Sequence, residues 1–215
     1  MRLLVVLVLL LGTPSLARAD GEGQVWDALI VQYRPAEGGI AGWFDGHVRR
    51  GSSTVTILRP AIGWGFGKHL TLHAGYAYIH TFIKDMDDGR EHRTWQQALY
   101  NHPISGELKL QGRFRVEQRF IDGDDGTGHR LRMLARVQYS PRADAPQLVV
   151  IDEVFVNLVE TMRIAKGYNQ NRAFVGLGAD IKVKGLRVEG GYQNVHFDGG
   201  RMDHALVLNL FAVIP

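Results

Sequence analysis

The chain has 215 residues, no cysteine, 25 basic and 22 acidic residues, and a formal net charge of +3. This near balance, with arginines spread along the chain rather than clustered, argues against nucleic acid as a partner. The lack of cysteine excludes disulfide bonds and a lipoprotein anchor, so backbone pairing and burial must hold the fold.

Residues 1–19 have the pattern of a secretory signal peptide. A positive start at Arg2 precedes a short apolar run, and Ala17 and Ala19 form a small-residue cleavage pattern. The apolar run is too short for a permanent membrane helix. Removal of this segment takes away Arg2 and Arg18, which lowers the formal charge from +3 to +1 and leaves 196 residues (215 minus 19).

The rest of the chain is predicted to be a series of β-strands separated by turns rich in glycine and aspartate. No window has a helical period, and after residue 19 no apolar segment approaches the roughly 18 to 20 residues of a spanning helix. The predicted strands, in chain order, are residues 24–33, 40–49, 54–66, 70–83, 91–100, 107–121, 129–140, 148–158, 170–183, 186–197 and 203–213.

The length of these windows favours a membrane barrel. Many of them have 10 to 14 residues, whereas strands of globular domains usually have about 5 to 6 and strands that cross a bilayer need about 9 to 11. We therefore predict an all-β fold, an antiparallel transmembrane β-barrel of about 10–12 strands, made by a single domain at residues 20–215. Residues 24–33 have no settled place in this count: they form a plug, an extra segment or half of a strand pair.

The alternation of side chains in residues 107–120 is the strongest strand signal. One parity is almost wholly ionic and the other apolar, and successive side chains of a strand leave opposite faces. A soluble sandwich would bury the apolar face, whereas a membrane barrel would turn it to lipid. The alternation recurs in residues 129–140, 171–184 and 186–197, which favours the membrane barrel. Aromatic residues near window ends suggest interfacial girdles: Trp26, Tyr33, Trp43, Trp64, Phe66, Phe82, Tyr100, Phe120, Tyr139 and Phe197.

The ionic parities predict a ladder of opposite charges along the lumen. Neighbouring antiparallel strands place such charges about 4.5 to 5.5 Å apart, and the planar guanidinium pairs two-pronged with a carboxylate. The ladder either fills a narrow barrel and fixes its register, or it lines a pore that favours anions. Its predicted members are Arg93, Glu107, Lys109, Arg113, Arg115, Glu117, Arg119, Arg130, Arg132, Arg136, Glu153, Arg172, Asp180, Arg187 and Glu189.

Other polar residues give little support for catalysis or metal binding. His102 and Ser105 invite comparison with lipid hydrolases, but their segment has the proline and glycine of a turn, and the chain has no Gly-x-Ser-x-Gly elbow. The acidic segment 122–126 lacks the later glutamate of a calcium loop. We therefore predict no catalytic residues, no metal and no cofactor.

Several short motifs, in their order and spacing, resemble a bacterial family known as domain of unknown function 2490. The motifs are Leu58-Arg59-Pro60 with Gly63, then residues 75–78, 91–97, 113–120, 130–132, 152–157, 169–172 and 190–192. The resemblance covers nearly all of the chain after residue 19. It implies an outer-membrane β-barrel, without an established activity. One departure from general barrel practice is that Phe211 is followed by four further residues, whereas such proteins often end on an aromatic residue.

The sequence thus predicts a small integral β-barrel in a bacterial outer membrane, exported by its signal peptide. Its role would be structural, or that of a narrow channel for small solutes. Two alternatives stay open: an outer-membrane lipid-modifying hydrolase, and a soluble periplasmic β-barrel that holds an apolar ligand against an inward apolar parity. The expected partners are outer-membrane lipids, together with the barrel-assembly machinery and periplasmic chaperones during biogenesis, and no nucleic acid.

Overall fold

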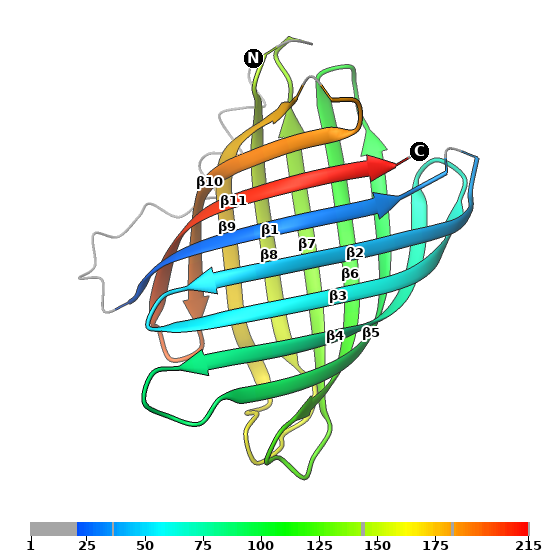
Figure 1. The fold of residues 1–215 in the computed structure, drawn as a ribbon. Coiled ribbons are helices and arrows are strands. Elements are labelled where there is room, and N and C mark those ends of the chain that lie inside the picture. Colours follow the sequence, from blue (N-terminus) through cyan, green and yellow to red (C-terminus); the bar gives the residue numbers. More distant parts are fainter. Residues whose placement is uncertain (1–20, 36, 143–144, 182, 215) are drawn as a thin grey trace.

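The computed structural model describes residues 21–35, 37–142, 145–181 and 183–214, so the predicted signal peptide at residues 1–19 lies outside the described residues. The described residues form eleven β-strands that close into one barrel (Figure 1). Among them no helix is long and apolar enough to cross a membrane, a finding that does not bear on strands. The strands are β1 (Gly23–Tyr33), β2 (Gly39–Arg50), β3 (Ser53–Phe66), β4 (Leu70–Ile83), β5 (Gly89–Pro103), β6 (Leu108–Ile121), β7 (Gly128–Tyr139), β8 (Gln147–Asn157), β9 (Gly167–Asp180), β10 (Leu186–Phe197) and β11 (Met202–Ile214).

Strand β1 closes the barrel. Each strand pairs antiparallel with the next along the chain, whereas β1 and β11 pair in parallel, from Gly23 opposite His204 to Tyr33 opposite Ile214. The segment 24–33 is therefore a strand of the wall and not a plug. The prediction of an all-β barrel of 10–12 strands is confirmed.

The odd number of strands puts the two described chain ends at opposite rims of the barrel. We name the rim at Ile214 the C-terminal rim, and the rim at Gly21 the N-terminal rim. Single-chain bacterial membrane barrels usually have an even number of strands, so the parallel closure is a departure from that pattern. The connections at the N-terminal rim are residues 51–52, 84–88, 122–127, 158–166 and 198–201.

Turn geometry moves the ends of two of the predicted strands. Glu107 lies in a turn before β6, because the Ser105 hydroxyl oxygen accepts hydrogen bonds from the backbone N–H groups of Glu107 and Leu108 at 3.2 and 3.1 Å. Strand β9 ends at Asp180, since the chain then turns through Gly185, whose φ is +82°. The alternation of polar and apolar side chains did not predict either turn.

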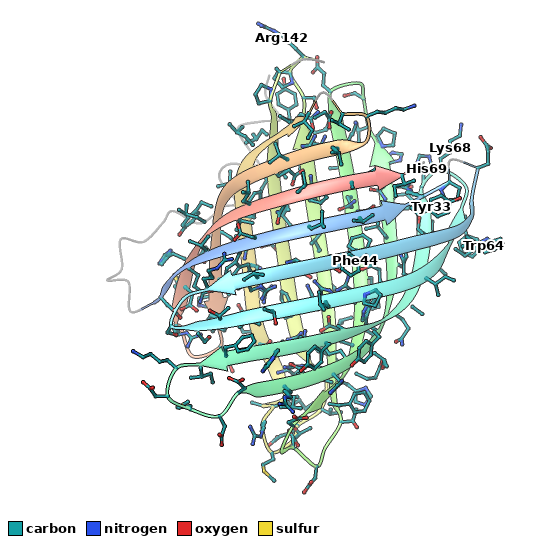
Figure 2. The ribbon with its side chains drawn as sticks, in the orientation of Figure 1. Tyr33, Phe44, Trp64, Lys68, His69 and Arg142 are labelled. Carbon is teal, nitrogen blue, oxygen red and sulfur yellow. The ribbon has the colours of Figure 1, made fainter. Side chains whose placement is uncertain are left out.

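The apolar parity of the strands faces outward, and the ionic parity faces the lumen. Phe44 and Trp64, both on the outer face, are 38% and 52% exposed (Figure 2), whereas Arg115 and Glu117 of β6 are fully buried. This is the arrangement expected of a membrane barrel. It is the opposite of the arrangement that the soluble, apolar-ligand alternative requires.

The lumen also contains apolar side chains, which the ionic-lumen prediction did not include. One cluster joins Trp26, Val149, Phe174, Val195, Ala205 and Val207, and a second joins Ile57, Ala77, Ile79 and Trp95. Trp26 is only 8% exposed. Its predicted place in an interfacial girdle was therefore wrong, because its parity on β1 faces the interior. Tyr33, Trp64, Phe66, Phe82, Tyr100 and Phe120 do lie exposed near strand ends.

Polar side chains also lie on the apolar outer face, and two examples show how they pair. The Thr94 hydroxyl donates a hydrogen bond to the Gln118 side-chain oxygen at 2.8 Å. The Asn171 amide donates to an Asp152 carboxylate oxygen at 2.8 Å. In both cases outward polar atoms on neighbouring strands satisfy each other, which lowers the cost of placing them on a face without water.

Candidate functional site

Glu117 of β6 is at the centre of the charges in the lumen. Its carboxylate accepts hydrogen bonds from Arg130 Nη2 at 2.6 Å and from Arg132 Nη1 at 2.7 Å. Arg93 and Arg115 each bring a guanidinium nitrogen to 3.8 Å from the same carboxylate. The strand register explains these contacts, because Arg130 and Arg132 on β7 stand opposite Glu117 and Arg115 on β6.

Two more carboxylates extend this cluster into a network across β5–β8. Glu153 accepts hydrogen bonds from Arg132 Nε at 2.9 Å and from Arg113 Nη2 at 2.6 Å. Glu91 accepts hydrogen bonds from both Nε and Nη2 of Arg93, at 2.7 and 2.6 Å. It also forms an ion pair with Arg119 of β6. Arg132 and Arg93 therefore link three carboxylates. Such shared, two-pronged pairs give each buried charge more than one partner.

A second group of charges lies nearer the C-terminal rim of the lumen. Glu189 of β10 is fully buried and pairs with Arg136 of β7 and with Arg187 Nε at 2.8 Å. Arg187 also donates to the side-chain oxygen of Gln147. These contacts join strands β7, β8 and β10 across the lumen.

Asp45 and Arg59 form a buried ion pair that the sequence analysis missed. Their exposed fractions are 2% and 5%, and Arg59 Nε lies 3.0 Å from both carboxylate oxygens. The Trp43 indole N–H donates to the same carboxylate at 2.7 Å, and His47 also contacts it. The alternation of residues 40–49 puts Trp43, Asp45 and His47 on one face. That signal was available, but it is weak because the same parity includes an apolar residue, Ala41.

Aromatic rings pack against several arginines of the lumen. The Arg115 guanidinium carbon lies 4.3 Å from the centre of the Trp95 ring. The guanidinium carbons of Arg132 and Arg172 each lie 4.5 Å from the centre of the Phe155 ring. Trp95 fits because Gly75 has no side chain: a Cβ there would come within 2.6 Å of the indole ring. The glycine and the tryptophan together hold the Arg115 side chain in place.

Most members of the predicted charge ladder meet inside the barrel. Glu107, Lys109 and Asp180 do not, because they lie at the C-terminal rim and are exposed. Asp180 approaches Arg187 only to 3.6 Å and has a 70% exposed side chain. The members whose side chains are at least partly buried in the lumen are Arg93, Arg113, Arg115, Glu117, Arg119, Arg130, Arg132, Arg136, Glu153, Arg172, Arg187 and Glu189.

A cavity of about 350 Å³ occupies the part of the lumen nearer the C-terminal rim. Arg34, Gln138 and Val213, at the ends of their strands, line its outer part, while Arg49 and Arg172 line its inner part. Its arginines are Arg34, Arg49, Arg59, Arg113, Arg132, Arg136, Arg172 and Arg187, and its acidic residues are Asp27, Asp45, Glu153 and Glu189. The lining is therefore strongly basic.

Buried side chains fill part of the lumen toward the N-terminal rim. The lining of the cavity does not include Glu117, Arg130 or Phe155, which lie between it and that rim. In the loop at residues 158–166, the side chain of Ile164 is only 5% exposed and packs next to Gly128 at the start of β7. This loop is held to the loop at 122–127, where hydrogen bonds from the Thr161 hydroxyl and the loop backbone lower the pKa of Asp124.

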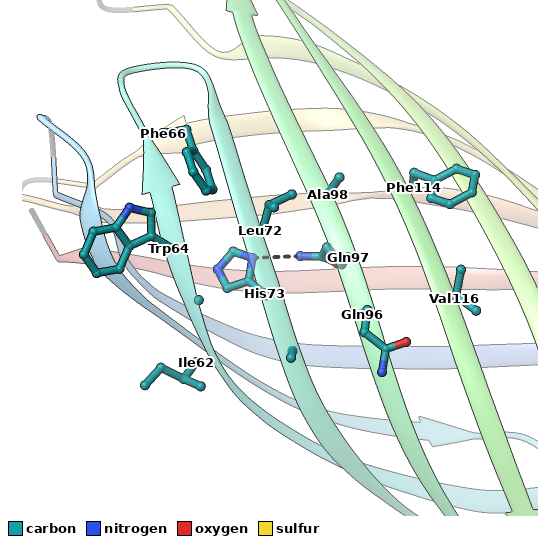
Figure 3. A pocket seen from close by; sticks show the side chains of 12 residues that line it. Ile62, Trp64, Phe66, Leu72, His73, Gln96, Gln97, Ala98, Phe114 and Val116 are labelled. Atoms are coloured by element: carbon teal, nitrogen blue, oxygen red, sulfur yellow. Dashed lines mark hydrogen bonds between the residues drawn. The ribbon is translucent and has the colours of Figure 1, made fainter.

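A separate groove of about 550 Å³ lies on the outer face of β3–β6 (Figure 3). Trp64, Phe66 and Phe114 border it, and small residues such as Ala98 form its floor. His73 and Gln97 lie beneath this wall, where their side chains form a hydrogen bond of 3.5 Å. The groove is mainly apolar and belongs to the outward-facing surface of the barrel.

His102 and Ser105, which the sequence analysis compared with residues of lipid hydrolases, do not form a catalytic arrangement in the part of the chain that the structure describes. The Ser105 hydroxyl stabilises its own turn by accepting two backbone hydrogen bonds. His102 stacks on Tyr100, with ring centres 6.0 Å apart, and lies 5.7 Å from the ring of His69. Ser105 therefore lacks the oriented base that a nucleophile needs.

Comparison with known proteins identifies relatives but no activity. The chain is 30% identical, over 223 aligned positions, to an uncharacterized protein of Methylorubrum extorquens, with 98% of this chain and 96% of that protein covered. No solved structure matches the chain. A family model described as "Protein of unknown function (DUF2490)" matches residues 23–203, which confirms the resemblance found in the sequence motifs. The chain therefore belongs to the DUF2490 family of proteins of unknown function.

Proposed function

We propose that this protein is an integral outer-membrane β-barrel whose lumen is closed at the N-terminal rim by a structural network of arginines and carboxylates. One observation supports this most strongly: a closed barrel turns its apolar parity outward and buries its charges in hydrogen-bonded pairs. Only a closed barrel or a helix satisfies all backbone hydrogen bonds within a bilayer. The export signal predicted at residues 1–19 and the span of the strands, 11 to 15 residues, support the same location.

The burial of the network favours a structural role over an open channel. Glu117, Arg115 and Glu189 are fully buried, so no water column passes along them. Buried charges of this kind are retained only with good partners, because removing one partner costs about 3–5 kcal/mol. A barrel of this size also has little free lumen once its arginines fill it.

The closed lumen predicts that the purified barrel conducts no ions. Reconstitution into planar bilayers should give no stepwise current above the leak of protein-free bilayers, because the described side chains fill the lumen near Glu117. A porin inserted under the same conditions is the control for successful reconstitution. Reproducible current steps would contradict the closed lumen and would favour the second candidate function, a narrow channel; Arg115→Ala should then shift the ion selectivity.

A further inference from the structure

Three arginines of the cavity have no carboxylate partner among the described residues. One of them, Arg34, donates a hydrogen bond to the Lys68 carbonyl oxygen at 2.6 Å, and the other two are Arg49 and Arg172. Arg49 forms neither a hydrogen bond nor an ion pair within the described part of the chain, and its Nε is buried without a partner. Among the described residues, the hydrogen-bond partner of the Arg172 guanidinium is the Gln170 side-chain amide, whose oxygen accepts at 2.7 and 3.2 Å when it faces the guanidinium. The nearby buried carboxylates already have two or more cationic or histidine partners each: Asp45, Glu91, Glu117, Glu153 and Glu189. The side chains of Arg49 and Arg172 line the same cavity.

Trp26 holds these two arginines in place without neutralising them. The guanidinium carbon of Arg49 lies 4.0 Å from the centre of the indole ring, and that of Arg172 lies 4.9 Å from it. The face of an aromatic ring attracts a cation but carries no net charge. Two neighbouring cations in a low-dielectric interior repel each other. An anion in the cavity would remove that repulsion and satisfy the free N–H groups of Arg49.

We propose that the cavity binds a small organic oxyanion, with Arg49 and Arg172 as the residues that bind its carboxylate or phosphate group. The planar guanidinium is suited to both groups, since each offers two oxygens to its N–H fork. The cavity volume of about 350 Å³ admits a small molecule. Ile30, Leu134 and Ile151 give part of the lining an apolar character, which fits an anion that carries a short uncharged group.

The proposed site rests on the proposed function in one respect, namely a lumen closed beyond the cavity. Binding and conductance are measured separately, so a conducting barrel that binds anions would contradict only the closed lumen. A barrel that conducts no ions and binds no anion would contradict only the proposed anion site.

The test is calorimetric titration of the full-length mature barrel, folded in detergent at low ionic strength, with inorganic phosphate and with phenyl phosphate. Both should bind, phenyl phosphate more tightly, and phenol should not bind. The double variant Arg49→Gln/Arg172→Gln should weaken binding by at least about tenfold. Arg90→Gln, which changes an exposed arginine of β5, should leave binding unchanged.

A second measurement separates loss of the site from loss of the fold. Because Arg49 and Arg172 have no carboxylate partner, the double variant should melt without ligand at or above the wild-type temperature. Phenyl phosphate should raise the melting temperature of the wild type and not that of the variant. Arg49→Lys, which keeps the charge but loses the fork, should bind with intermediate affinity. Absence of binding by the wild type, or equal binding by the double variant, would overturn the proposal.

Discussion

Replacing Glu117 by glutamine is expected to lower the free energy of unfolding of the barrel by about 3–5 kcal/mol. The carboxylate is fully buried and accepts hydrogen bonds of 2.6 and 2.7 Å from Arg130 and Arg132. Glutamine keeps the size of the side chain but removes its charge, so these guanidiniums lose a shared partner and stay buried. The measurement is the temperature at which the folded band converts to the unfolded band on a semi-native gel.

Glu107→Gln is the matched control for this variant. Both glutamates belong to the alternating parity of residues 107–120, but Glu107 lies exposed in the turn before β6. Its replacement should change the free energy of unfolding by no more than about 0.5 kcal/mol. If Glu117→Gln converted at the same temperature as Glu107→Gln, the network would have no structural role.

Arginine placed at Val116 or Val175 is expected to block assembly of the barrel in the outer membrane. Val175 is 45% exposed on the outer face of β9, and Val116 faces outward between the buried Arg115 and Glu117. An arginine on the lipid face of a membrane strand costs about 2–4 kcal/mol near the bilayer midplane. The measurement is the amount of folded, protease-resistant protein in the outer-membrane fraction, which should fall strongly for Val116→Arg and for Val175→Arg.

Asp125→Arg, in the exposed loop at 122–127, introduces the same side chain outside the strands and should assemble like the wild type. Normal outer-membrane assembly of both valine variants would refute the proposed lipid contact of this face. Reduced assembly of the loop variant as well would show instead that any added arginine disturbs export.

Periodicity predicted the strands and their faces because both follow from the period-two geometry of an extended chain. It could not predict how far along the barrel axis a side chain lies. Glu107, Lys109 and Asp180 were therefore assigned to the same ladder as Glu117 although they lie at a rim. The axial position depends on the register and on the turns, such as the one that Ser105 stabilises.

The alternation of side chains also could not predict how the barrel closes or which residues form part of its interior. The parallel pairing of β1 with β11 is a contact between the two ends of the chain, and no local signal encodes it. Asp45 and Arg59 were missed because apolar residues interrupt the polar parity of Asp45, and Arg59 is a single charge within a mainly apolar parity. That Arg49 and Arg172 lack a carboxylate partner among the described residues became recognisable only when their neighbours in space were known.

Heat-modifiability of the protein in purified outer membranes tests the proposed membrane barrel most directly. Samples of one membrane fraction are run on a denaturing gel with and without boiling. We expect the unboiled sample to migrate faster and to resist protease, because the closed eleven-strand barrel stays compact in detergent. An unshifted band, together with recovery of the protein in the soluble periplasmic fraction, would contradict the proposal.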